Sequence, residues 1–206
     1  MRDFRVAHGA TELLLIRHAE AEPLPMSEAA EPKDVDLPLT SRGRTQAAAL
    51  AARLTHRDLA AVYTSPLRRA RETAAEIAEA TNLSIADDAR LREVEIAGVG
   101  SVAMHDLAEI AIASGGWSHL PGTESSHAIR TRMHAALDAI VAAHPGERVA
   151  AISHAGAINA YVASLLGLTS DFFFPTGNTS ISIVRARDAR RLVVTLNDIA
   201  HLEYLR

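Results

Sequence analysis

The sequence of 206 residues contains no cysteine, a single lysine and few aromatic residues. Without cysteine there is no disulfide, no thiolate metal ligand and no redox function through sulfur. Aromatic residues make up 4% of the chain and the net charge is -4, so the composition does not favour a nucleic-acid partner. No apolar run reaches the length of about 18 residues that suggests a membrane span, and the N-terminal segment lacks the apolar core of a signal peptide. We therefore expect a cytoplasmic protein with no membrane partner.

Chain length and hydrophobic content are enough for one large core. Hydrophobic residues make up 48% of the chain, and neither an internal repeat nor a low-complexity linker divides it. We expect one domain over residues 1–206. Arginine is abundant throughout, which we interpret as a compositional bias, so an arginine is assigned a role only from its position.

Short apolar segments alternate with amphipathic ones along the sequence. The pattern predicts strands at 13–16, 59–65, 83–87 and 147–153, and helices at 41–54, 66–81, 121–144 and 154–167, with a short helix near 103–111. Segments 178–186 and 191–198 alternate polar and apolar residues around a turn, which is typical of an antiparallel pair. This order predicts a three-layer α/β fold, in which helices cover both faces of a mainly parallel sheet with an antiparallel edge.

Three of the predicted strands end in residues that can bind or transfer an anion. The strand 13–16 leads into Arg17 and His18, and the strand 147–153 leads into His154. The strand 59–65 leads into Ser65-Pro66, which we expect to cap a helix that carries Arg68 and Arg69 in its first turn. Because the carboxyl ends of parallel strands share one sheet edge, these groups should converge there.

Two guanidinium groups and two imidazoles suit a phosphoryl ligand. Planar guanidinium forks match its oxygens, and a neutral imidazole can attack phosphorus. Such a reaction requires neither a metal ion nor a cofactor, but it needs a proton donor for the leaving alcohol. Glu93 and Glu95 in the irregular segment after 83–87 are the candidates.

The sequence resembles the histidine phosphatase superfamily, also called phosphoglycerate mutase-like. The resemblance covers residues 13 to about 185 and rests on five segments in the order of the family, LLLIRHAEAE, LTSRGRTQA, YTSPLRRARETA, LREVEIAG and AAISHAGAI. It implies that His18 is the nucleophile and that Arg17, Arg69 and His154 bind the phosphoryl group. His154 is also implied to stabilise charge in catalysis, and Glu93 to act as the general acid and then the general base.

Two departures from the family pattern concern the nucleophile and the substrate lid. Ala19 follows the nucleophile where the family usually has glycine, and the Trp-Glu-Gly that commonly follows the acid motif is missing. We expect a small lid segment around 95–122. Glu124, Arg130 and Arg132 resemble a segment that flanks the site in relatives, or they belong to a capped, solvated helix start.

The resemblance implies a metal-independent phosphatase that acts on a small phosphorylated substrate. Family mutases are longer and have a more extensive insertion, so phosphoglycerate mutase-type phosphoryl transfer is the second interpretation. A non-catalytic module that binds phospho-ligands is the third, and the intact candidates for nucleophile and acid argue against it. The sequence leaves the substrate and the oligomeric state open.

Overall fold

The computed structural model describes residues 9–23, 36–95, 113–116 and 122–205. Its sheet has six strands in the order β3-β2-β4-β1-β5-β6. The strands are β1 (Thr11–Arg17), β2 (Leu59–Thr64), β3 (Ile85–Asp87), β4 (Arg148–Ser153), β5 (Ile181–Arg187) and β6 (Arg190–Asp198). The helices are α1 (Ser41–Leu54), α2 (Arg68–Thr81), α4 (Ser126–Ala143) and α5 (Ala155–Leu165), with the short 3-10 helices η2 (Ala89–Leu91) and η4 (Ala200–Leu205).

The sheet is parallel in its centre and antiparallel at one edge. Strand β4 pairs in parallel with both β1 and β2, and β2 pairs in parallel with β3. Strand β5 runs antiparallel to β1, and β6 runs antiparallel to β5. This confirms the predicted mainly parallel sheet with an antiparallel edge.

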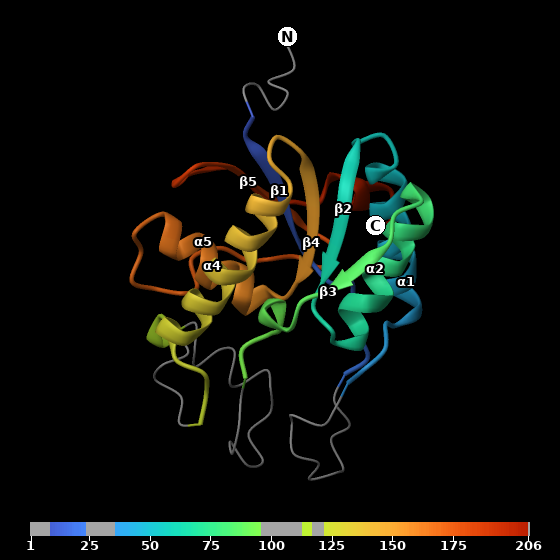
Figure 1. The fold of residues 1–206 in the computed structure, drawn as a ribbon. Coiled ribbons are helices and arrows are strands. Elements are labelled where there is room, and N and C mark those ends of the chain that lie inside the picture. Colours follow the sequence, from blue (N-terminus) through green and yellow to red (C-terminus); the bar gives the residue numbers. More distant parts are fainter. Residues whose placement is uncertain (1–8, 24–35, 96–112, 117–121, 206) are drawn as a thin grey trace.

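Alternate residues of the central strands enter two different hydrophobic cores. In β1, Leu13 and Leu15 pack in a cluster with residues of α4 and α5, whereas Leu14 and Ile16 pack in a cluster with residues of α1 and α2. Figure 1 shows these two pairs of helices on opposite sides of the sheet. The continuous apolar run at 13–16 therefore has the composition of a strand that is buried on both faces.

The helix α1 has a side-chain cap, whereas α2 lacks the cap that the sequence predicts. Thr40 caps α1 by accepting a hydrogen bond from the Gly43 N–H (2.8 Å). The prediction that Ser65 caps α2 is wrong, because α2 begins at Arg68 after Leu67. The Ser65 hydroxyl accepts a hydrogen bond from the Leu67 N–H (3.3 Å), just before α2 begins, and also contacts the His154 ring in the site.

The expected lid and the short helix near 103–111 lie mostly outside the described residues. A lid at 95–122 and a single domain over the whole chain therefore stay predictions. In the part of the chain that the structure describes, no helix is long and apolar enough to cross a membrane.

Candidate active site

The register of the three central strands brings their carboxyl ends together. Arg17 at the end of β1 lies opposite Ser153 at the end of β4, and the His18 N–H donates to the Ser153 carbonyl (3.0 Å). On the other side of β4, the Ser65 N–H donates to the Ile152 carbonyl (2.9 Å). His18, His154 and Ser65 thus follow three adjacent strands at one edge, as the sequence predicts.

His18 is held in the tautomer that a nucleophile requires. Its Nδ1 lies 2.7 Å from the Ala19 carbonyl, to which it can only donate, and its Nε2 accepts a hydrogen bond from Arg69 Nε (3.2 Å). Burial, with the neighbouring Arg69 and Arg17 guanidinium groups, lowers the pKa of His18 from 6.5 to about 3. The ring is therefore neutral near pH 7, and its Nε2 lone pair faces the cationic side of the site.

Arg17 and Arg69 supply that cationic side. Burial lowers the pKa of both guanidinium groups, and the negative charge of Glu93 acts in the opposite direction on each. Arg17 Nη1 donates to the Thr176 carbonyl (2.5 Å), while its buried Nε has no hydrogen-bond partner among the described residues. The alternative arginine, Arg68, pairs with Glu72 on the exposed side of α2, so the structure brings Arg69 and not Arg68 to His18.

His154 is completely buried beside His18. Its ring centroid lies 5.0 Å from that of His18, and its Nε2 lies 2.8 Å from Ser65 Oγ. Its Nδ1 has no partner in the described part of the chain. Burial, together with His18 and Arg69, lowers the pKa of His154 well below 6.5, so this ring is also neutral.

Glu93 reaches the same region from the segment after η2. Its carboxylate accepts hydrogen bonds from three backbone N–H groups, those of Val94 (3.0 Å), Gly156 (3.3 Å) and Ala157 (3.1 Å), the last two at the start of α5. Its charge acts on both Arg17 and Arg69. Glu95, the alternative proton donor, is exposed, and its backbone contacts Glu124 instead. The geometry thus favours Glu93 over Glu95.

The segment after His18, the predicted nucleophile, is held by helices α1 and α2. The Ala19 N–H donates to Thr73 Oγ1 on α2 (3.0 Å), and the Glu20 N–H donates to Gln46 Oε1 on α1 (2.9 Å). A Cβ on Gly43 would lie 1.9 Å from the Glu20 carbonyl oxygen, so only glycine allows α1 to approach this closely. Ala19 itself packs in a small buried cluster, which accommodates its methyl group.

The sequence analysis did not identify the loop before β5, which holds the backbone of Arg17 and His18. The Thr179 N–H donates to the Arg17 carbonyl (3.0 Å), and Asn178 Nδ2 donates to the His18 carbonyl (3.1 Å). Thr179 has a φ of 56°, a backbone conformation that is unfavourable for a β-branched residue and that often occurs at functional sites. The residues in contact lie about 160 positions apart in sequence, so no local pattern could have indicated them.

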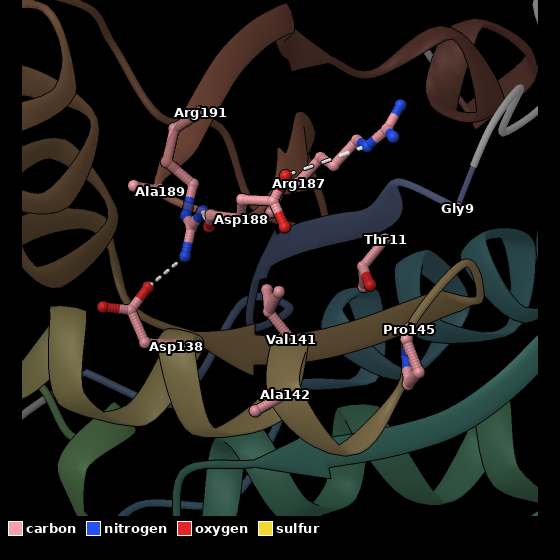
Figure 2. Close-up of a pocket in the computed structure, with 11 residues that line it drawn as sticks. Gly9, Thr11, Asp138, Val141, Ala142, Pro145, Arg187, Asp188, Ala189 and Arg191 are labelled. Atoms are coloured by element: carbon pink, nitrogen blue, oxygen red, sulfur yellow. Dashed lines mark hydrogen bonds and ion pairs between the residues drawn. The ribbon is translucent and has the colours of Figure 1, made fainter.

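A hollow of about 700 Å³ lies at the other end of β1 and is distinct from the site described above. Figure 2 shows Thr11, from the start of β1, beside it, and the ion pair of Arg191 with Asp138 across it. Arg187 and Asp188 form a second, longer pair at 3.9 Å. Since these charged groups pair with each other, they do not indicate a ligand.

The chain matches the family model "Histidine phosphatase superfamily (branch 1)" over residues 13–199. It is 30% identical to phosphoserine phosphatase 1 of Hydrogenobacter thermophilus, over 93% of this chain and 94% of that protein. It is also 30% identical to a probable phosphoglycerate mutase of Klebsiella pneumoniae, over 93% of this chain and 95% of that protein.

Two solved structures share the fold over nearly the whole chain. YhfR of Bacillus stearothermophilus superposes with a TM-score of 0.79 at 27% identity, covering 94% of this chain and 100% of that one. A mycobacterial glucosyl-3-phosphoglycerate phosphatase, solved in complex with VO3, superposes with a TM-score of 0.74 at 25% identity, covering 90% of this chain and 98% of that one.

Proposed function

This chain belongs to the histidine phosphatase superfamily and is a phosphatase, and we propose that it hydrolyses small phosphomonoesters through a phosphohistidine formed on His18. One observation carries the mechanism. Arg17 Nε and His154 Nδ1 are buried without a partner among the described residues, next to a neutral imidazole whose lone pair is available. Buried polar atoms of this kind are rarely left unpaired, and a phosphoryl oxygen satisfies both.

The phosphoryl group binds between the two arginines and His154. Arg17 Nε–H and the Arg69 guanidinium donate to its oxygens, which replaces the contact between Arg69 and His18 Nε2. The Ser65 hydroxyl donates to His154 Nε2, which leaves Nδ1–H of that ring to donate to a third oxygen. Bound in this way, the dianion offsets the mutual repulsion of the guanidinium groups.

In the first step, His18 Nε2 attacks phosphorus as the ester oxygen leaves on the opposite side. The bond from phosphorus to the ester oxygen breaks, and protonated Glu93 transfers its proton to the departing alcohol. The phosphorylated ring gains positive charge and keeps its Nδ1–H, which the Ala19 carbonyl stabilises. Arg17, Arg69 and His154 stabilise the charge on the phosphoryl oxygens in the transition state.

In the second step, water replaces the alcohol. The Glu93 carboxylate accepts a proton from the water as its oxygen bonds to phosphorus, and His18 Nε2 leaves with its lone pair restored. Inorganic phosphate is the product, and Glu93 is again protonated for the next turnover.

A mutase would use the same first step and then return the phosphoryl group to a second alcohol. The probable mutase relative is covered to 95% of its length by this chain, so chain length does not separate the two activities. The phosphatase assignment is supported by the relatives named as phosphatases, and the substrate of this chain is proposed only as a class. The cytoplasmic location and the absence of a nucleic-acid partner stay predictions.

The test is to incubate the protein, with a metal chelator present, with phosphoserine, phosphoglycerates, sugar phosphates and an aryl phosphate. Free phosphate and isomerised product are both measured, and the protein is quenched and assayed for acid-labile phosphate. We expect the wild type to release phosphate and to carry acid-labile phosphate on the protein. Both should be lost in His18→Ala and kept in His56→Ala, which is a control at an exposed histidine. Isomerisation without phosphate release would overturn the phosphatase assignment, and turnover in His18→Ala would overturn the nucleophile.

A further inference from the structure

The Arg132 guanidinium binds the backbone of the segment that carries Glu93. From α4, Arg132 Nη1 donates to the carbonyls of Arg90 (2.7 Å) and Arg92 (2.7 Å), and Nη2 donates to the carbonyl of Glu93 itself (3.1 Å). In this segment the buried side chains of Leu91 and Val94 pack in the core, and the Leu91 carbonyl accepts a hydrogen bond from Ser153 Oγ (2.8 Å). Arg132 adds contacts to three further carbonyls, two of which lie between these anchored residues.

Glu124 orients that guanidinium and joins the same segment. Arg132 Nε donates to Glu124 Oε1 and Nη2 donates to Oε2, both at 2.7 Å, so the two side chains form a bidentate pair. The backbone N–H of Glu124 also donates to the Glu95 carbonyl (2.8 Å). All five N–H groups of Arg132 are therefore used, three on the segment and two on the carboxylate.

We propose that Arg132 is a positioning residue that holds Glu93 where it can transfer a proton to the leaving oxygen. The inference rests on the proposed role of Glu93 as the general acid. The Glu93 carboxylate reaches the N–H groups of Gly156 and Ala157 at the start of α5, while Arg132 on α4 holds the backbone carbonyl of the same residue. General acid catalysis depends on hydrogen-bond geometry at the leaving oxygen, so a shift of the backbone reduces proton transfer without removing the phosphate ligands.

Arg130 supplies a matched control on the same helix. Its side chain is 22% exposed, against 20% for Arg132, and it also combines a carboxylate partner with a backbone carbonyl. These partners are Asp171 and Thr169, in the loop after α5 and away from Glu93. Loss of Arg130 therefore removes an ion pair and one carbonyl contact on the same helix, neither of which involves the Glu93 segment.

The experiment measures kcat/KM for a series of aryl phosphates whose leaving phenols range from weakly to strongly acidic. A strongly acidic phenol leaves without protonation, so its ester does not need Glu93, whereas phenyl phosphate does. We expect Arg132→Met to lower kcat/KM for phenyl phosphate by about 10- to 100-fold and to lower it for the p-nitrophenyl ester by less than about 3-fold. Arg132→Lys keeps the charge but not the five-donor fork, and should fall between wild type and Arg132→Met.

The controls separate this inference from the role of Glu93 itself. Arg130→Met should change kcat/KM for all esters by one common factor. In a Glu93→Gln background, Arg132→Met should not change how kcat/KM depends on the leaving group. If both Arg132 variants lower kcat/KM by the same factor for every ester, the positioning role is overturned and Arg132 has a purely structural role. If Glu93→Gln leaves the dependence on the leaving group unchanged, the proposed general acid fails, and the inference with it.

Discussion

The depressed pKa of His18 makes folding stability depend on pH in a way that can be measured without any substrate. Burial and the two arginines hold its pKa at about 3 in the folded protein, whereas an unfolded chain has the ordinary value near 6.5. Below that ordinary value the unfolded state binds a proton that the folded state does not. Stability therefore falls as the pH decreases below about 6.5, and this loss is complete only below about pH 3.

The magnitude follows from the two pKa values. Between about pH 8 and about pH 5, proton uptake by the unfolded state at this one position lowers the free energy of unfolding by about 2 kcal/mol. The full difference, reached at more acidic pH, is about 5 kcal/mol. His18→Gln removes the titrating ring and keeps an amide that can form hydrogen bonds, so its loss of stability between the two pH values should be smaller by about 2 kcal/mol.

The assay is urea unfolding of both proteins at the two pH values, in buffers without phosphate, because a bound anion would itself stabilise the folded state. Equal m-values for the two proteins are the control that the difference reports stability rather than a change in the exposed surface. Titrating groups remote from His18 cancel in the comparison, and repeating it in a His154→Gln background removes the contribution of His154, whose pKa His18 helps to lower. A parallel decline of wild type and His18→Gln would refute the account of His18 as a buried, neutral nucleophile.

Two further substitutions test the surroundings of the nucleophile. Arg69→Met removes a positive charge and an N–H donor beside His18, so the pKa of His18 should rise. We expect kcat/KM to fall by about 10- to 100-fold, and to fall further as the pH is lowered. A pH–rate profile with the wild-type shape would contradict this. Gly43→Ala places a methyl group against the Glu20 carbonyl oxygen and should destabilise the protein by about 3 kcal/mol or more, measured by urea unfolding; an unchanged midpoint would show that α1 does not lie this close.

The main elements and the convergence of the site could be predicted because each depends on a local pattern or a general rule of sheets. The run at 13–16 is apolar on every residue because β1 is buried on both faces, and parallel strands deliver Arg17, His18 and His154 to one edge whatever the details of the loops. The prediction did not require knowledge of the strand order.

The parts that could not be predicted depend on contacts between distant segments. Ser65 looks like a helix cap in sequence because Pro66 follows it, yet its hydroxyl lies against a histidine about 90 positions later. The sequence alone does not distinguish whether the start of α4 flanks the site or is a solvated helix start. In the structure, Arg132 of α4 donates to three carbonyls of the irregular segment that carries Glu93. The direction of a backbone carbonyl in an irregular segment cannot be predicted from hydrophobic periodicity.

His18 and Glu93, the two residues that we propose to react, are held by separate sets of contacts. The backbone of His18 is held from the antiparallel side of the sheet, by Thr179 and Asn178 before β5. The backbone of Glu93 is held from a different element, by Arg132 on α4. In-line transfer requires the nucleophile and the proton donor to stay on either side of the phosphorus atom, at a separation that neither residue can set alone. Because β5 pairs with β1 and α4 packs in the same core cluster as Leu13 and Leu15 of β1, both sets of contacts are placed relative to one strand before any substrate binds.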